Sequence, residues 1–168
     1  MTSLVIRPAG KDDYPAILEL NESLVHFLSP MDEAKLSHLH EESELLYVAE
    51  LSGNVEAFAL CIREGKDYDS VNYTWFSEHY PQFLYVDRIV VSNNAQGKGI
   101  GAALYKEVFK HAQETGVSHV TAEIDILPPN PGSLVFHEKF GFKEVGQQAV
   151  AGGKKRVSLQ AVEVKAED

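Results

Sequence analysis

The chain has 168 residues, of which 44% are apolar and 24% are charged, and its formal net charge at pH 7 is −10. This length and composition predict one globular domain, which we expect to span residues 1–168. The acidic balance excludes general binding to nucleic acid or to an anionic membrane, because both need a basic face. It is compatible with a cationic small substrate.

Cys61 is the only cysteine, so an internal disulfide is impossible and a reducing compartment is expected. Because Cys61 lies in the apolar run 57–62, a buried, inert thiol is favoured over a catalytic nucleophile. No run of residues has the apolar length of a transmembrane helix, and the first residues lack the basic and apolar regions of a signal peptide. We therefore expect a cytoplasmic protein without membrane contact.

In chain order, the first part of the sequence predicts a strand, two helices and a β-hairpin. The strand ends at Pro8, and the acidic pair Asp12 and Asp13 precedes a helical pattern that continues to Phe27. The strand, the two helices and the two hairpin strands are expected over residues 4–7, 12–27, 32–42, 45–51 and 55–62.

Residues 64–82 differ from the flanking segments, because they are polar, irregular and rich in aromatic side chains. They predict a long loop, and such a loop in a compact domain is usually functional or flexible. Two interpretations of Tyr73, Trp75 and Phe76 stay open. Either these side chains wall an acceptor pocket, or they cover the core or a dimer contact.

The rest of the chain alternates strands with helices and closes in a hairpin. Asn130 before Pro131 is typical of a helix cap followed by a first turn. The order of elements indicates one mixed α+β domain with a frayed tail after Val164. A strand, a helix, a strand, a short helix and two final strands are expected over residues 83–91, 99–115, 119–126, 130–139, 142–150 and 156–164.

The most informative segment lies between the strand that ends at Val91 and the helix that follows. Its sequence is Gln96-Gly97-Lys98-Gly99-Ile100-Gly101-Ala102. Glycines leave backbone N–H groups uncovered, and the helix start adds unpaired donors and a positive dipole end. The segment therefore predicts an anion site for phosphates, and the alternative is a turn that only joins a strand to a helix.

Two other phosphate motifs compete with this interpretation. A P-loop needs Ser or Thr after Gly-Lys, whereas Gly99 follows Lys98. Gly97, Gly99 and Ala102 do satisfy a dinucleotide fingerprint, and Glu123 lies about where a ribose-binding acid is expected. That fingerprint starts almost directly at a strand end, however, and five residues intervene here. A nicotinamide-dependent dehydrogenase is therefore the weaker alternative.

The segment resembles a signature of the GNAT superfamily of acetyltransferases. Gln96 to Gly101 is similar to the family's Q/R-x-x-G-x-G/A pyrophosphate loop, and Ile89-Val90-Val91 resembles its central strand. A second family signature, N-x-x-A-x-x-x-Y-E-K-x-G-F, resembles the residues Asn130, Ser133, His137, Glu138, Lys139, Gly141 and Phe142. The departures are Ser133, where alanine is common, and His137, where tyrosine is usual.

The resemblance implies a mixed, twisted and splayed central sheet of about seven strands flanked by about four helices. It also implies acetyl-CoA as co-substrate, without a metal, and a possible homodimer. Pantetheine would pair with the backbone of Ile89 and Val91, beside Val90, while amides from Gly97 to Ala102 would hold the pyrophosphate. Further cofactor contacts are expected from Asn130, Ser133, Phe136 and His137.

Acetyl transfer to an amine needs a base, a donor to the carbonyl oxygen and an acid for the leaving thiolate. His137 is either the acid or a residue that only binds the cofactor. For the base, the candidates in order are Asp87, Tyr85 and Glu123, each also plausible as a structural partner of a nearby cation. Glu123 is in addition a candidate for binding the acceptor.

These features favour an N-acetyltransferase that moves the acetyl group directly to a primary amine of a small molecule. A non-catalytic CoA-binding sensor or partner module is the alternative from another class. The sequence does not identify the acceptor amine or the acyl length.

Overall fold

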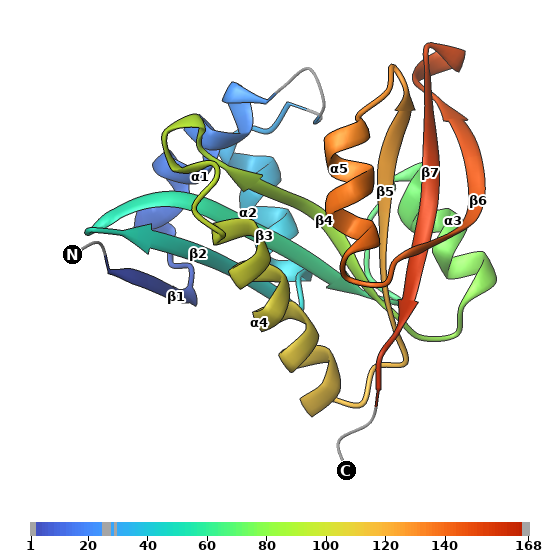
Figure 1. Cartoon of the computed structure of the whole chain (residues 1–168), viewed down its shortest axis with the longest axis horizontal. Helices are drawn as coiled ribbons and strands as arrows, with labels where there is room; N and C mark the ends of the chain where they lie inside the picture. The colour runs from blue at the N-terminus through green and yellow to red at the C-terminus, as the bar shows by residue number, and fades with distance from the viewer. Residues whose placement is uncertain (1–2, 25–27, 29, 166–168) are drawn as a thin grey trace. The chain divides into compact units, whose positions relative to one another are not determined.

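The computed structural model describes residues 3–24, 28 and 30–165 (Figure 1). Its strands form a seven-stranded mixed sheet with the order β1-β2-β3-β4-β5-β7-β6. The chain divides into two compact units, Met1–Ile62 with Val86–Lys110 and Arg63–Tyr85 with His111–Asp168. The expected α+β class with a mixed sheet of seven strands is confirmed.

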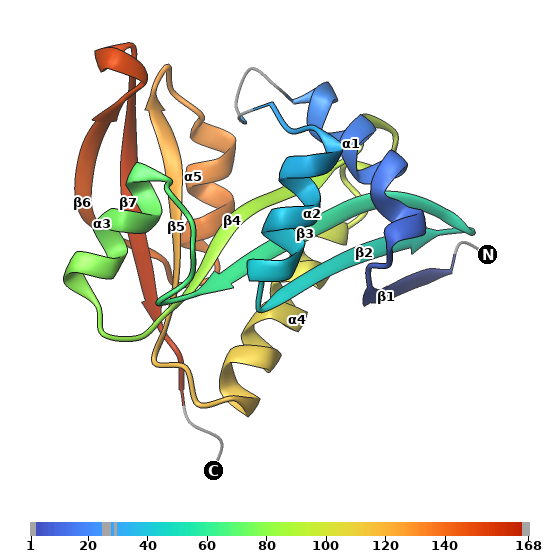
Figure 2. The ribbon, with the colours of Figure 1, turned by 180° about the vertical axis from the view of Figure 1, so that it is seen from behind.

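The first unit contains three antiparallel strands, most of a fourth strand, and helices on both faces. Helices α1 and α2 lie on one face of these strands and α4 lies on the other, as Figures 1 and 2 show from opposite sides. The bounds are β1 Leu4–Pro8, α1 Tyr14–Ser23, α2 Glu33–Glu42, β2 Leu45–Leu51, β3 Asn54–Arg63, β4 Leu84–Val91 and α4 Ile100–Glu114.

Small side chains on β2 and β3 let α4 approach the sheet closely. Ala49, Ala57 and Ala59 are fully buried, and they form one cluster with Ile100 and Leu104 of α4. The two α4 residues are four positions apart, so they share one face of the helix. This packing fixes the N-terminal end of α4, where the glycine turn of residues 96–99 ends.

Cys61 lies on β3 and is completely buried. Burial raises the pKa of its thiol far above the ordinary value, and the nearby Asp87 carboxylate adds to this effect. The expectation that this thiol is buried is confirmed, and the raised pKa agrees with low reactivity.

The second unit consists of a three-stranded part of the sheet with one helix on each face. β5 pairs antiparallel with β7, and β7 pairs antiparallel with β6. The start of β4 pairs parallel with β5, with Tyr85 opposite Thr121. Helices α5 and α3 lie on opposite faces (Figures 1 and 2). The bounds are α3 Val71–His79, β5 His119–Leu127, α5 Pro131–Glu138, β6 Lys143–Val150 and β7 Lys155–Glu163.

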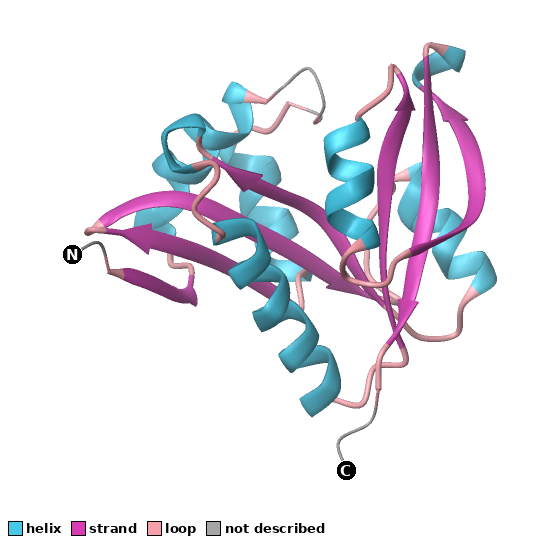
Figure 3. Cartoon of the chain, in the orientation of Figure 1, coloured by secondary structure: helices cyan, strands magenta, loops and turns pink. Residues whose placement is uncertain are grey.

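The prediction of a loop over residues 64–82 is wrong for its central part, which forms helix α3 (Figure 3). The side chain of Ser70 caps this helix by accepting a hydrogen bond from the Tyr73 N–H, at 3.4 Å. Tyr73 and Phe76, three positions apart, are buried on its inner face. The described residues therefore form five α-helices, one more than expected.

The first helix also differs from its prediction. It ends at Ser23, because Leu24 leaves helical geometry with φ −121° and ψ 25°. The end of the predicted helix, residues 25–27, lies outside the described residues, as do residues 166–168 of the predicted tail. Every other predicted element agrees with the observed bounds within one residue.

Candidate active site

The glycine turn in the first unit presents its backbone to solvent. Residues 96–99 are exposed between β4 and the first residue of α4. Gly97 and Gly99 have φ values of +80° and +78°, and an added Cβ at either position would meet nothing within 4 Å. The positive φ explains why glycine stands at both positions. The exposed amides and the start of a 15-residue helix form an anion-binding arrangement.

The base of this turn is fixed to the sheet. The Ser92 N–H donates to the carbonyl oxygen of Glu56, at 2.8 Å, and the Ser92 hydroxyl donates to the Glu56 carboxylate. Ala95 before the turn and Ile100 after it are buried in the same cluster. The turn is therefore held at both ends, while Lys98 and the glycines between them stay accessible.

Asp87, the first candidate for the base, is held in a buried ion pair. Its Oδ2 accepts a hydrogen bond from the Arg88 Nε, at 2.7 Å, and each side chain is 3% exposed. The Arg88 guanidinium also donates to Asn21 Oδ1 on α1, at 2.8 Å. Asp87 thus compensates a buried cation, which is the structural alternative that the sequence left open.

The cofactor-side residues of β4 alternate in their burial. Val90 is fully buried, whereas Ile89 and Val91 are half-buried and pack against the cluster beneath α4. This alternation is typical of a strand in which successive side chains point to opposite faces.

Tyr85 and Glu123, the other two candidates, meet in the second unit. The Tyr85 hydroxyl lies 2.7 and 2.8 Å from the two carboxylate oxygens of Glu123. A phenol has one hydrogen, so these two distances describe one donor shared between two acceptors. The Tyr85 side chain is fully buried. The sequence identified both residues separately, but not this contact.

Asp125 follows Glu123 by two positions and lies on the same face of β5. Its Oδ2 lies 3.8 Å from the Nζ of Lys155 on β7. Burial raises the pKa of Asp125, and the positive charge of Lys155 opposes this shift in part.

The aromatic residues of α3 pack against the second unit. Tyr73 and Phe76 are buried in its core. The indole of Trp75 lies over Gly146, where an added Cβ would come within 2.5 Å of Cζ2, and it stacks on the His79 ring at 3.8 Å. All three side chains thus have packing partners, as in the interpretation that they cover the core.

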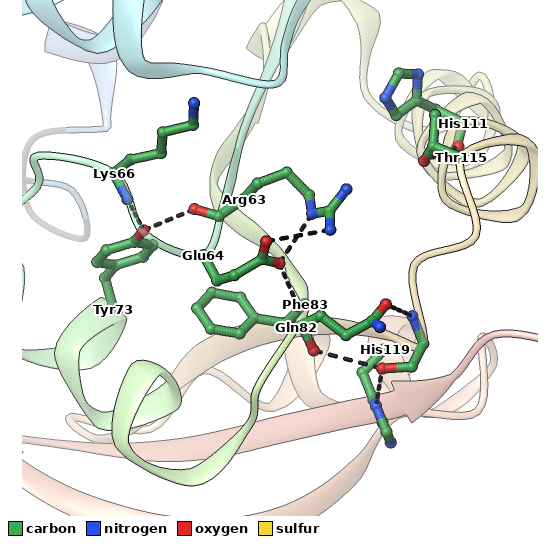
Figure 4. A network of polar contacts seen from close by, with 10 residues as sticks. Arg63, Glu64, Lys66, Tyr73, Gln82, Phe83, His111, Thr115 and His119 are labelled. Atoms are coloured by element: carbon green, nitrogen blue, oxygen red, sulfur yellow. Dashed lines mark hydrogen bonds and ion pairs between the residues drawn. The ribbon is translucent and has the colours of Figure 1, made fainter.

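Hydrogen bonds fasten both ends of the segment that contains α3 (Figure 4). The Tyr73 hydroxyl donates to the Arg63 carbonyl oxygen, at 2.6 Å, and accepts from the Lys66 N–H, at 2.9 Å. Glu64 accepts from the Phe83 N–H, at 3.0 Å. Gln82 accepts from the Ser118 N–H, at 3.0 Å, which joins the end of the segment to the start of β5.

His137 is buried in α5. Asn130 caps the helix by accepting from the Ser133 N–H, at 3.4 Å. The His137 Nδ1 donates to the Ser133 carbonyl oxygen, at 2.7 Å, and the ring contacts Phe136 and Phe142 edge-on. Burial lowers the pKa of His137, and the hydrogen bond to Ser133 opposes this only in part.

Among the described residues, no group of three His, Cys, Asp or Glu side chains is placed to hold a metal ion. Within the same residues, no helix has the length and apolarity needed to cross a membrane.

The sequence matches the model of the acetyltransferase (GNAT) family over residues 13–142. Several solved structures are similar. The ribosomal-protein-S18-alanine N-acetyltransferase of Escherichia coli is 18% identical, with a TM-score of 0.76 over 99% of this chain and 97% of that chain. The yncA structure of Salmonella typhimurium, which holds acetyl-CoA, is 20% identical, with a TM-score of 0.73 over 98% and 95%.

A third structure, Naa50 of Arabidopsis thaliana in complex with the bisubstrate analogue CoA-Ac-MVNAL, is 15% identical, with a TM-score of 0.74 over 95% and 98%. At these identities the structures show the fold. Among curated proteins, no sequence matches this chain. The match to the family model covers more than half of the chain, and the fold agrees with it. The chain belongs to the acetyltransferase (GNAT) family and is an acyltransferase that uses acetyl-CoA.

Proposed function

We propose that this acetyltransferase moves the acetyl group of acetyl-CoA directly to a primary amine of a small molecule. The observation that carries the proposal is the exposed turn at the start of α4, with Gly97 and Gly99 in the left-handed region. Its exposed backbone and the helix dipole suit the two negative charges of the CoA pyrophosphate. The pyrophosphate ligands in this proposal are Gln96, Gly97, Lys98, Gly99, Ile100, Gly101 and Ala102.

The remaining cofactor contacts are assigned from the two family signatures. In this proposal the backbone of Ile89, Val90 and Val91 pairs with pantetheine in the manner of an added strand. Residues of α5 complete the cofactor side. They are Asn130, Ser133, Phe136 and His137.

In the proposed reaction the amine nitrogen attacks the thioester carbonyl carbon. The new N–C bond replaces the C–S bond, the amine gives up one proton to a base, and the CoA thiolate takes up one proton. Backbone N–H groups are suitable donors to the carbonyl oxygen, which gains negative charge during the attack. Direct transfer fits Cys61, since a fully buried thiol with a raised pKa is a poor candidate for an acetyl carrier.

The lowered pKa of His137 bears on the choice between its two roles. At neutral pH a lowered pKa leaves little imidazolium, and in the neutral ring the proton is on Nδ1, which donates to Ser133. A neutral ring without a proton on Nε2 is a poor donor to a thiolate at that nitrogen. We therefore favour the cofactor-binding role.

The packing of α3 does not separate a small acceptor from a protein acceptor, and the preference for a small cationic amine rests on the net charge of −10. The aromatic side chains that the sequence offered for an acceptor pocket are packed against the second unit, and Tyr73 and Phe76 are buried. Relatives of the same fold include an enzyme for a ribosomal protein, so peptides with a free N-terminus belong in the same assay.

The cofactor site is tested by a matched pair of substitutions at Gly99. Asn and Asp have nearly the same size and both tolerate the left-handed region, so they differ mainly in charge. We expect Gly99→Asp to weaken acetyl-CoA binding at least tenfold, about 1.4 kcal/mol, through repulsion of the pyrophosphate, and Gly99→Asn to weaken it less. Isothermal titration calorimetry measures both affinities, and circular dichroism checks the fold.

Equal acetyl-CoA affinities of the two variants would show that the pyrophosphate does not bind at this turn. Binding of NAD in place of CoA would instead support the dinucleotide alternative. Thiol release over a panel of amines and peptides then tests the reaction, and a wild-type protein that binds CoA but releases no thiol would be the non-catalytic module.

A further inference from the structure

Strand β3 contains a β-bulge whose extra residue is Glu56. Ala49 of β2 pairs with Ala57 of β3. The next β2 residue, Glu50, pairs with Val55, which lies two positions from Ala57. Glu56 therefore stands between two consecutive pairs of the ladder. Bulges of this kind redirect a side chain or end the pairing of a strand, and they are common next to active sites.

The carbonyl group and the carboxylate of Glu56 both bond to Ser92, the first residue after β4. The Ser92 N–H donates to the Glu56 carbonyl oxygen, at 2.8 Å, and the Ser92 hydroxyl donates to the Glu56 carboxylate. Ser92 is also the N-cap residue of the 3-10 helix η2, Asn93–Ala95, and a serine hydroxyl in that position often bonds to the helix itself. Here the hydroxyl bonds to the bulge, so two groups of one β3 residue hold the end of β4.

The contact with Ser92 lies just before the glycine turn and is connected to it. The Ala95 N–H donates to the Ser92 carbonyl oxygen, at 3.0 Å, which closes the short helix η2. Residues 96–99 follow directly, and two of them are glycines with positive φ. Glycine loses more backbone freedom on ordering than any other residue, so a mobile turn would bind a ligand at a cost in entropy. An anchor at Ser92 lowers this cost, because the turn is ordered before the ligand arrives.

The charge of Glu56 makes it unsuitable as a direct ligand of an anion, because a carboxylate repels a pyrophosphate. We propose that Glu56 is a positioning residue, whose carboxylate holds Ser92 and thereby orients the glycine turn for the pyrophosphate of CoA. The inference rests on the proposed function, which assigns the pyrophosphate to this turn. The bulge, Ser92 and the turn all belong to the first unit.

The first test needs no cofactor. Relaxation of ¹⁵N nuclei gives order parameters for the backbone amides of Gly97 and Gly99. We expect lower values at both glycines in Glu56→Ala and in Ser92→Ala, since either substitution removes the side-chain contact and leaves the backbone hydrogen bond. Gly116, which also has a positive φ and lies beyond the other end of α4, should keep its value. Unchanged order parameters at Gly97 and Gly99 overturn the proposal, whether or not the turn binds CoA.

The second test measures acetyl-CoA affinity by isothermal titration calorimetry. Glu56→Ala and Ser92→Ala should each weaken binding by about fivefold or more. The double variant should bind no more weakly than either single variant within twofold, because both substitutions remove the same contact. Additive losses would mean that the two side chains act separately, and would overturn the proposal, as would wild-type affinity in both single variants.

A conservative variant separates the hydrogen bond from the bulk of the side chain. Glu56→Gln keeps an oxygen that can accept from the Ser92 hydroxyl, so it should bind acetyl-CoA more tightly than Glu56→Ala does. Equal losses of affinity in these two variants would overturn a role for the hydrogen bond. Circular dichroism checks the fold of each variant, and Ser92→Ala makes the same test without a change in the bulge itself.

The matched control is Glu50→Ala, on the β2 side of the same bulge. The Glu50 carboxylate accepts from the Arg7 guanidinium, at 2.9 Å. We expect this variant to have a lower melting temperature but an acetyl-CoA affinity within twofold of the wild type. Equal losses of affinity in Glu50→Ala and Glu56→Ala would show general loosening of the bulge and overturn a specific role of Glu56. A wild-type protein that does not bind acetyl-CoA would instead be a failure of the proposed function.

Discussion

At the scale of single residues, burial makes polar side chains depend on partners within the protein. Arg88 is 5% exposed, and its guanidinium bonds to Asp87 on the same strand and to Asn21 on α1. A buried cation needs such partners, because removal from water is otherwise costly. Asp87 therefore stabilises the packing of β4 against α1, and it is a poor choice for the base.

His137 makes stability depend on pH. Its pKa is lowered in the folded state, so the unfolded chain binds more protons as pH falls below the ordinary value of 6.5. The stabilisation is present above pH 6.5 and is lost as pH falls toward the folded pKa. We expect the difference in urea unfolding free energy between pH 7.5 and pH 5.5 to become smaller in His137→Phe.

A wild-type pH dependence in His137→Phe would mean that His137 does not titrate differently in the folded state. The same variant also tests the role of the ring. Loss of acetyl-CoA affinity alone supports cofactor binding, and loss of kcat alone supports the acid.

At the scale of elements, the side chain of Trp75 governs how α3 lies on the sheet. The indole contacts the backbone of Gly146 on β6, and Asn72 of the same helix accepts a hydrogen bond from Gln148, at 3.0 Å. Glycine is needed on β6 because a Cβ there would overlap the indole. The helix and the strand therefore fit together because the large Trp75 side chain lies over a position that has no side chain.

Gly146→Ala should destabilise the protein by about 1–3 kcal/mol, because the new methyl forces Trp75 to move. Urea unfolding measures the loss. Gly132→Ala in α5 is the matched control, since its Cβ meets nothing within 4 Å, and it should be neutral or slightly stabilising. If both variants were equally stable, Trp75 would not be packed on Gly146. Replacing the indole by a smaller side chain, in the double variant Gly146→Ala with Trp75→Leu, should restore part of the lost stability.

Local signals made most elements predictable. The alternation of β4 and the turn of Gly97 and Gly99 depend on neighbours in sequence, so pattern and backbone freedom were sufficient. Helix α3 was missed because its aromatic residues and polar surroundings suggested an irregular binding loop. The Ser70 cap and the spacing of Tyr73 and Phe76 were the signals that could have revealed it.

The candidate site was less predictable than the fold, because its contacts join distant residues. Alternation placed Tyr85 and Glu123 on defined faces of their strands, but their meeting depends on the parallel register of β4 and β5. The ion pair of Asp87 with Arg88 was only one of several possibilities. Burial of His137 depends on Phe142, which lies outside α5.

At the scale of the whole molecule, cofactor binding should appear as added stability. A ligand that binds only the folded state at 100 times its dissociation constant adds about 2.7 kcal/mol. For a chain of this length, the expected rise in melting temperature is roughly 5–10 °C. Differential scanning fluorimetry with acetyl-CoA measures it, and NAD at the same concentration is the control. An equal rise with both ligands would contradict selective recognition of CoA.

The buried position of Cys61 allows its thiol to report local unfolding of the first unit. The Cys61 thiol on β3 is fully buried, and Cys61 is the only cysteine in the chain. Alkylating reagents can therefore reach this thiol only after β3 separates from its neighbours. One covalent label per molecule, counted by mass spectrometry over time, would therefore record the opening frequency of the first unit under native conditions, without any engineered tag.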